Sequence, residues 1–193
     1  MYSSPSIVQI QVVLHQISPP RPRRSWDCLS LNGLMSMSDE LATRVVLFLD
    51  AHHVMSLATF GEEGPHAANL FYVRDGFSLI WVSDPDSRHS VNIAARPQVA
   101  VTIAPDYSDY SEIMGLQIAG KAERIARKLE QVRAQNLLRT RYPFMERLPE
   151  QPQELIDAYE RTQVYLLRPA RIVLIDNKRG FGSKEILEID SNL

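Results

Sequence analysis

Cysteine is almost absent from this chain of 193 residues, because Cys28 is the single one. No internal disulfide can form, and a metal centre built on several thiolates is excluded. No apolar run reaches the roughly 20 residues that a membrane-spanning helix needs. The net charge of −2 gives no general attraction to nucleic acid or to an anionic membrane surface. We therefore expect neither nucleic acid nor a membrane as a partner.

Motifs that carry chemistry on their own side chains are also missing. The sequence has no GxGxxG turn before a helix and no GxxxxGK[ST] phosphate loop. It has neither the GxSxG turn of serine hydrolases nor the HExxH pair of zinc peptidases. The adjacent His52 and His53 have no third ligand at a matching spacing, which favours a role at a helix end over metal binding. A bound cofactor would have to supply any reaction chemistry.

The composition is that of an ordinary globular protein, with 45% hydrophobic and 23% charged residues. The stretch SPPRPRRSWD within residues 1–36 is rich in proline and arginine, as is typical of segments that pack no core. We predict a flexible or poorly packed extension over 1–36 and one folded domain over 37–193. The first residues lack the basic start and unbroken apolar stretch of a signal peptide, so a cytoplasmic location is expected.

Hydrophobic periodicity predicts a mainly β chain of the α+β class. Strands are expected where apolar residues alternate, and helices where they recur every three or four positions. The first three strands are separated by short glycine-containing turns, which predicts an antiparallel meander. The predicted strands cover 54–60, 65–73, 77–83, 99–103, 113–125 and a pair within 163–175, and the predicted helices cover 38–49, 88–95, 126–141 and 152–161.

A short polar crossing over residues 83–87, SDPDS, holds the strongest candidate site. It ends one strand, and its last two residues are natural caps for the helix over 88–95. Free backbone N–H groups at the start of a helix attract anions. Serine hydroxyls and a planar guanidinium suit a phosphate group in particular. The side-chain donors at the crossing are Ser83, Ser87, Arg88 and His89.

The same residues also fit an ordinary capped helix on the protein surface. In that interpretation Arg88 is solvated and paired with Asp84 or Asp86. Many helices begin this way, and two aspartates disfavour a bare phosphate site. Spacing alone leaves both interpretations open.

Three stretches together resemble the pyridoxamine 5'-phosphate oxidase-like family, the FMN-binding split β-barrels. They are MSLATFGEEGPHAANLFYV, LIWVSDPDSRHSVNIAARPQVAVTI and IMGLQIAGKAERI, within residues 38–125, and the C-terminal part matches more loosely. The resemblance implies a six-stranded antiparallel Greek-key split β-barrel with flanking helices. It also implies a homodimer with one FMN in each of two clefts at the subunit interface.

The resemblance assigns flavin contacts to particular positions. The serines and the arginine of the crossing match contacts to the flavin phosphate, and His89 stands where the oxidases usually have a lysine. A histidine is only partly charged near neutral pH, which implies a weaker or pH-dependent grip. Gln117 lies on the strand that approaches the flavin ring, although the family's own glutamine aligns nearer Gly115. The predicted FMN contacts are Asn69, Leu70, Phe71, Tyr72, Val82, Ser83, Ser87, Arg88, His89 and Gln117.

The function implied by the resemblance is flavin-mediated transfer of hydride or electrons to or from a small molecule, with a reduced nicotinamide as one class of donor. No residue is predicted to act as a general acid or base. The C-terminal residues that bind the substrate in true pyridoxamine phosphate oxidases are not recognised, so vitamin B6 oxidation is not predicted. The alternatives are a non-catalytic flavin- or haem-binding module and a deazaflavin-dependent reductase. Haem would require an axial ligand, and no histidine follows His89.

Overall fold

The computed structural model describes residues 37–189, which belong to one compact unit. The extension predicted over residues 1–36 lies outside this range. The helices are α1 (Met37–Ala51), α2 (Arg88–Ala95), α3 (Lys128–Arg141) and α4 (Gln153–Glu160), with 3-10 turns η1 (Tyr110–Glu112), η2 (Pro143–Glu150) and η3 (Asn177–Arg179). The strands are β1 (Val54–Gly61), β2 (Gly64–Phe71), β3 (Val73–Asp75), β4 (Ser78–Ser83), β5 (Gln98–Ile103), β6 (Met114–Arg124), β7 (Gln163–Asp176) and β8 (Lys184–Glu188).

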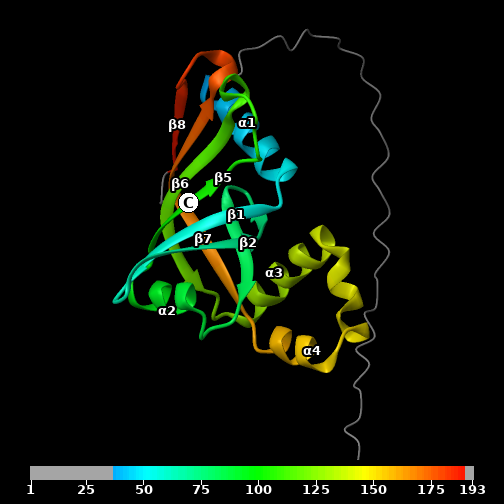
Figure 1. Cartoon of the computed structure of the whole chain (residues 1–193). Coiled ribbons are helices and arrows are strands. Elements are labelled where there is room, and N and C mark those ends of the chain that lie inside the picture. The colour runs from blue at the N-terminus through cyan, green and yellow to red at the C-terminus, as the bar shows by residue number, and fades with distance from the viewer. Residues whose placement is uncertain (1–36, 190–193) are drawn as a thin grey trace, which may run out of the picture. The chain divides into compact units, whose positions relative to one another are not determined.

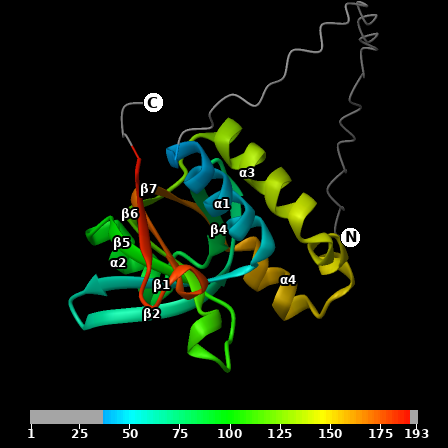
Figure 2. The same cartoon turned by 90° about the horizontal axis from the view of Figure 1, so that it is seen from above.

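The strands form a single curled antiparallel sheet in the order β2-β1-β5-β6-β7-β4-β3, with β8 added on β7 (Figure 1). Helices α3 and α4 lie on one side of it and α2 lies on the other in both views (Figure 2). The predicted α+β split-barrel class is confirmed. The described residues hold eight strands rather than the six expected, because β3 and β8 extend the sheet.

The predicted meander is wrong. Strand β2 pairs only with β1 and forms one edge of the sheet, whereas β3 pairs with β4 at the other edge. The chain leaves the first ladder at Tyr72, whose N–H donates to the carbonyl of His53 and whose hydroxyl donates to the carbonyl of Leu49 at 2.8 Å. The expected strand pair within 163–175 is also a single long strand, β7, with an irregularity where it meets β6.

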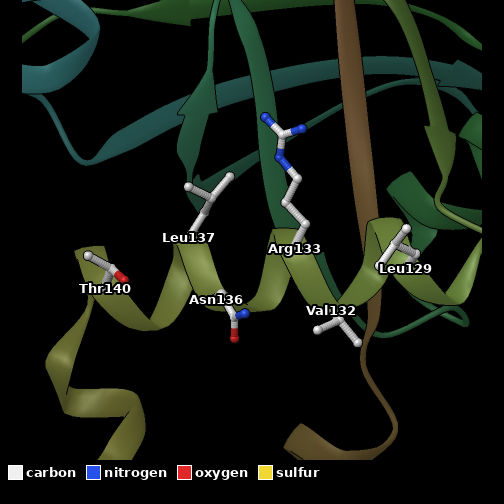
Figure 3. Close-up of a pocket in the computed structure, with 6 residues that line it drawn as sticks. All are labelled: Leu129, Val132, Arg133, Asn136, Leu137 and Thr140. Atoms are coloured by element: carbon white, nitrogen blue, oxygen red, sulfur yellow. The ribbon is translucent and has the colours of Figure 1, made fainter. Parts of the chain in front are cut away.

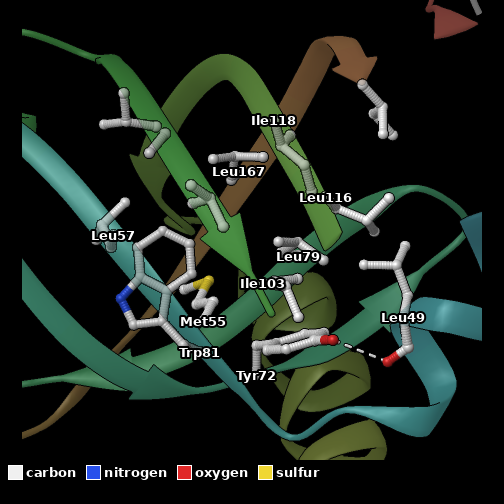
Figure 4. Close-up of a cluster of buried hydrophobic side chains, with 14 of the residues drawn as sticks. Leu49, Met55, Leu57, Tyr72, Leu79, Trp81, Ile103, Leu116, Ile118 and Leu167 are labelled. Atoms are coloured by element: carbon white, nitrogen blue, oxygen red, sulfur yellow. Dashed lines mark hydrogen bonds between the residues drawn. The ribbon is translucent and has the colours of Figure 1, made fainter. Parts of the chain in front are cut away.

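The interior of the curled sheet is filled by side chains (Figure 4). Strands β1 and β5 bury every second residue, as their alternating sequences predict, and β6 does so over part of its length. Helix α1 adds an apolar stripe to the same core. The largest fully buried side chains include Trp81, Tyr72, Leu49, Met55, Leu57, Leu79, Ile103, Leu116, Ile118 and Leu167. Ligand sites are therefore expected on the outside of the sheet rather than within it.

Strand β4 is buried on both faces, because apolar residues occupy both sides of the strand. Leu79 and Trp81 face the main core, while Ile80 packs into a second cluster beneath α3. Val82 is partly buried against this second cluster. Because both faces of β4 are packed, the position of Ser83 at its end is fixed.

Candidate functional site

The crossing has the local structure predicted from its sequence. Strand β4 ends at Ser83, Ser87 occupies the N-cap position, and α2 runs over the predicted residues 88–95. The Ser87 N–H closes a turn by donating to the carbonyl of Asp84 at 3.1 Å. The backbone N–H of Asp86 donates to a carboxylate oxygen of Asp84 at 2.8 Å. The turn thus occupies one oxygen of the Asp84 carboxylate.

The side chain of Ser87 does not cap the helix. Its Oγ instead donates to the Asp84 carbonyl at 2.7 Å and lies 2.9 Å from the Oγ of Ser90. The N–H groups of the first turn of α2, from Arg88 to Ser90, have no acceptor within the helix. The start of α2 therefore combines free backbone donors with a cluster of hydroxyls.

His89 joins this cluster from within the first turn of α2. Its Nε2 lies 2.5 Å from the Oγ of Ser83 and 3.1 Å from the Oγ of Ser87. The residue is 7% exposed, and its ring stacks parallel to the ring of His66 on β2, with centroids 6.1 Å apart. Burial, and then the neighbouring His66, lower the pKa of His89 below its ordinary value. The neutral imidazole is the favoured form when no anion is bound.

Arg88 points toward the turn between β1 and β2, not toward the aspartates of the crossing. Its Nη2 donates to the carbonyl of Glu63 at 2.8 Å, and its Nε lies 3.4 Å from the Glu63 carboxylate. The side chains of Arg88 and Glu63 are 38% and 78% exposed, so solvent screens this pair. Asp84 faces Arg161 at 3.8 Å. The pairing of Arg88 with Asp84 or Asp86, which the surface-helix interpretation implies, is not found, and the guanidinium stays accessible to solvent.

The position of α2 depends on residues that the sequence did not single out. The amide of Asn92 is buried and donates to the Oγ1 of Thr59 on β1 at 3.1 Å. A Cβ at Gly61 would lie 1.9 Å from the Asn92 Oδ1, so only glycine lets β1 approach the helix this closely. These contacts and the His66 ring join residues far apart in the sequence, and no local pattern predicts them.

The four predicted flavin contacts from Asn69 to Tyr72 do not share one face. Asn69 and Phe71 are exposed on the outer side of β2, and the Asn69 side-chain oxygen accepts a hydrogen bond from the Ser56 hydroxyl at 2.7 Å. Leu70 packs on the core, and Tyr72 is fully buried. Phe71 is 54% exposed beside Tyr142, with ring centroids 5.4 Å apart.

The outer face of the sheet brings two predicted contacts from separate strands into one row. Asn69 lies opposite Ser56, Ser56 opposite Thr102, and Thr102 opposite Gln117, so four neutral polar residues cross β2, β1, β5 and β6. The next row along these strands consists of Ala67, Ala58, Ala100 and Ala119. All eight residues of these two rows are exposed. Ser56 and Asn69 are joined by the hydrogen bond given above.

Other features of the described residues offer less chemistry. A shallow hollow of about 350 Å³ lies along one helix, α3, and its lining residues are Leu129, Val132, Arg133, Asn136, Leu137 and Thr140 (Figure 3). Residues 37–189 hold no group of three or more histidine, cysteine or acidic side chains placed to bind a metal ion. No helix in this range combines the length and apolar character needed to cross a membrane.

Comparison with known proteins identifies the family. The sequence model described as pyridoxamine 5'-phosphate oxidase matches residues 41–172. The chain belongs to this family. The match includes β2, the crossing and Gln117, whereas β8 follows it. The family resemblance predicted from three sequence stretches is thereby confirmed.

Relatives of this family member include a UPF0306 protein from Photorhabdus laumondii, 29% identical over 139 residues that cover 71% of this chain and 88% of that protein. Among solved structures, a heme binding protein from Mycobacterium smegmatis has a TM-score of 0.62 at 23% identity, covering 81% of this chain and 60% of that one. The heme storage protein HutZ from Vibrio cholerae has a TM-score of 0.54 at 17% identity, covering 66% of this chain and 88% of that one. These structures support the fold alone.

Proposed function

We propose that this family member binds FMN, with the flavin phosphate at the start of α2, and acts as an FMN-dependent oxidoreductase. The observation that carries the proposal is the convergence of two serine hydroxyls, Ser83 and Ser87, with the free N–H groups of a helix start. Arg88 follows Ser87 directly in the sequence, and its guanidinium makes an exposed, weak ion pair with Glu63. This donor set fits a phosphate dianion.

The carboxylate of Asp84 does not oppose this proposal in the folded chain. One oxygen of Asp84 accepts the N–H of Asp86, and the other faces the guanidinium of Arg161. Both contacts turn the Asp84 carboxylate toward positive or donor groups of the protein. The Ser83 hydroxyl and the N–H groups at the start of α2 are the donors offered to an anion, and the Ser87 hydroxyl joins them when it rotates away from the Asp84 carbonyl.

His89 gives the phosphate grip its pH dependence. A dianion beside the imidazole favours the protonated form, and protonation would place a second cation next to Arg88. Because burial favours the neutral ring in the empty protein, binding of FMN near neutral pH is expected to take up a proton. Arginine at 88 supplies the permanent charge, and histidine at 89 supplies a conditional one.

The bound flavin would supply the hydride chemistry, and the chain would bind and orient it. Asn69 and Gln117 offer amide donors and acceptors on the outer face of the sheet, the side to which we assign the flavin ring. We assign no general acid or base. The proposed substrates are a reduced nicotinamide or another small molecule that can approach the exposed ring.

We extend the proposal to a homodimer in which the outer face of β2, β1, β5 and β6 covers the same face of a second copy. The outer row of alanines and the row of short polar residues beside it carry no charge, although an exposed antiparallel face is usually polar. Such a neutral surface of short side chains suits close packing against protein. The predicted flavin contacts Asn69 and Gln117 then lie at the subunit interface.

The test of the phosphate site compares two arginine variants of the full chain. Arg88→Ala should weaken FMN binding about tenfold, the loss expected for one charged contact that is partly screened. Arg96→Ala removes a guanidinium from the other end of α2, where it lies over the Phe60 ring, and should leave FMN affinity unchanged. Equal affinity of Arg88→Ala and the parent chain for FMN would refute the assignment.

The homodimer is tested separately from the flavin. Ala100→Arg places a long cation in the middle of the alanine row without disturbing the buried face of β5. The molar mass measured by light scattering after size exclusion should be that of a dimer for the parent chain and that of a monomer for Ala100→Arg. A parent chain that is monomeric at micromolar concentration would contradict the proposed interface. The proposed phosphate site would be unaffected by this result, because the arginine variants test it separately.

Haem binding without turnover is the second candidate, because two of the structural neighbours are described as heme proteins. Among the described residues, histidines occur only at positions 52, 53, 66 and 89, and the rings of the last two face the crossing rather than the outer face. A Soret band after addition of hemin, lost in a His66→Ala or His53→Ala variant, would favour this candidate over FMN.

A further inference from the structure

A second hollow, of about 800 Å³, opens where β6 meets the irregular part of β7. Its walls come from the β3–β4 turn, the start of β5, the middle of β6 and β7, and Ile189 after β8. None of the predicted flavin contacts lines it, but Ala119 of the alanine row does, so the hollow borders the face that we assign to the homodimer. Its size lies within the range of about 300 to 1,000 Å³ that is typical of small-molecule sites.

The hollow follows from a mismatch between two strands. Ala119 lies opposite Arg171, but Gly120 lies opposite Pro169, so Ala170 is an extra residue in β7. The backbones approach closely here, because a Cβ at Gly120 would lie 2.2 Å from the carbonyl oxygen of Arg168. The bulge and the small residues around it leave space that ordinary strand pairing would fill.

The charges around the hollow do not balance. Lys121 lies directly opposite Arg168 on one side and Gln98 on the other. Two cations facing each other across strands repel. Arg168 is neutralised by an ion pair with Glu123, whereas Lys121 has no ion-pair or hydrogen-bond partner for its ammonium group within residues 37–189. The Lys121 ammonium and the neighbouring Gln98 amide thus lie at a largely apolar hollow without a partner among residues 37–189.

We propose that this hollow binds a small amphipathic carboxylate, with its apolar body against Phe77, Pro97 and Ile189 and its carboxylate on Lys121. Apolar walls with one or two placed polar groups are the usual design of small-ligand sites. A carboxylate would give the Lys121 ammonium the negative partner that it lacks among residues 37–189. A neutral ligand of the same shape would gain the apolar contact only.

The experiment uses the full chain and two probes of the same shape, 2-naphthoate and its uncharged amide, 2-naphthamide, in calorimetric titrations. The carboxylate should bind about tenfold more tightly than the amide. Lys121→Gln should abolish this difference by weakening 2-naphthoate alone. Lys128→Gln removes an exposed lysine at the start of α3 and should change neither affinity.

A filling variant locates the binding. Ala170→Phe places a ring at an exposed position of the hollow and should remove binding of both probes, with a circular dichroism spectrum like that of the parent chain. Equal affinity of the two probes for the parent chain would overturn the proposal. Tight binding of 2-naphthoate to Ala170→Phe would overturn it as well, because the probe would then occupy another place.

Discussion

Arg141 joins the last turn of α3 to the end of α1. Its substitution should destabilise the fold more than the substitution of any other arginine of α3. Its Nη2 donates to the carbonyls of Asp50 at 2.9 Å and His52 at 2.6 Å, and lies 3.4 Å from that of Leu49. These carbonyls end α1 and begin the link to β1. The guanidinium therefore satisfies backbone acceptors that have no partner within the helix.

The cost of Arg141→Met follows from these contacts. Each of the two hydrogen bonds from this charged donor, to Asp50 and to His52, contributes about 1.5 to 3 kcal/mol, and a cation at the end of a helix adds about 0.5 kcal/mol. The Nε of Arg141 is buried without an acceptor among the described residues, so its removal returns about 1 kcal/mol. Solvent reaches part of the site and reduces the gain further. The expected loss of unfolding free energy is about 2 to 3 kcal/mol, or about 5 to 10 °C in Tm.

Urea unfolding monitored by tryptophan fluorescence measures this loss, and Arg139→Met provides the control. Arg139 lies on the same helix two residues earlier, is exposed, and has no ion pair within the described range. Its substitution should change the unfolding free energy by less than about 0.5 kcal/mol. A loss below about 1 kcal/mol for Arg141→Met, or equal losses for the two variants, would refute the capping role.

Two further predictions concern backbone approach and pH. Gly120→Ala should cost about 2 kcal/mol or more, because its Cβ would meet backbone atoms of Arg168 that cannot move independently; Ala119→Ser beside it should cost less than about 1 kcal/mol in the same urea assay. Because the pKa of His89 is lowered in the folded chain, the unfolded chain binds a proton at this histidine more readily. Protonation of His89 therefore has no effect on the free energy of unfolding above the ordinary pKa of 6.5 and lowers it increasingly as the pH falls below that value. Unfolding free energies measured from pH 8 to pH 5 should therefore fall less steeply for His89→Asn than for His53→Asn, and identical slopes would contradict the burial of His89.

Local patterns were sufficient to predict most elements. Alternation of apolar residues located β1, β5 and β6, and the polar crossing located the start of α2. The split-barrel class followed from the family resemblance rather than from periodicity. The order of the strands did not follow from the sequence, because the pairing of β4 with β7 joins residues that are 80 to 88 positions apart.

The candidate site shows the same division. The hydroxyls and the guanidinium of the crossing were predictable, since they lie within seven consecutive residues. The contact of Arg88 with Glu63, the stacking of His89 on His66 and the fit of Asn92 against Gly61 were not, because each depends on how β1 and β2 fold back onto α2. The row that joins Asn69 to Gln117 likewise depends on the register of four strands.

The most direct measurement compares FMN with riboflavin, which carries the same ring without the phosphate, in titrations of the flavin-free full chain. If the start of α2 holds the phosphate, FMN should bind more than about a hundredfold more tightly than riboflavin, because several charge-assisted contacts are lost together. Similar affinities for FMN and riboflavin, or no binding of either, would contradict the proposed site.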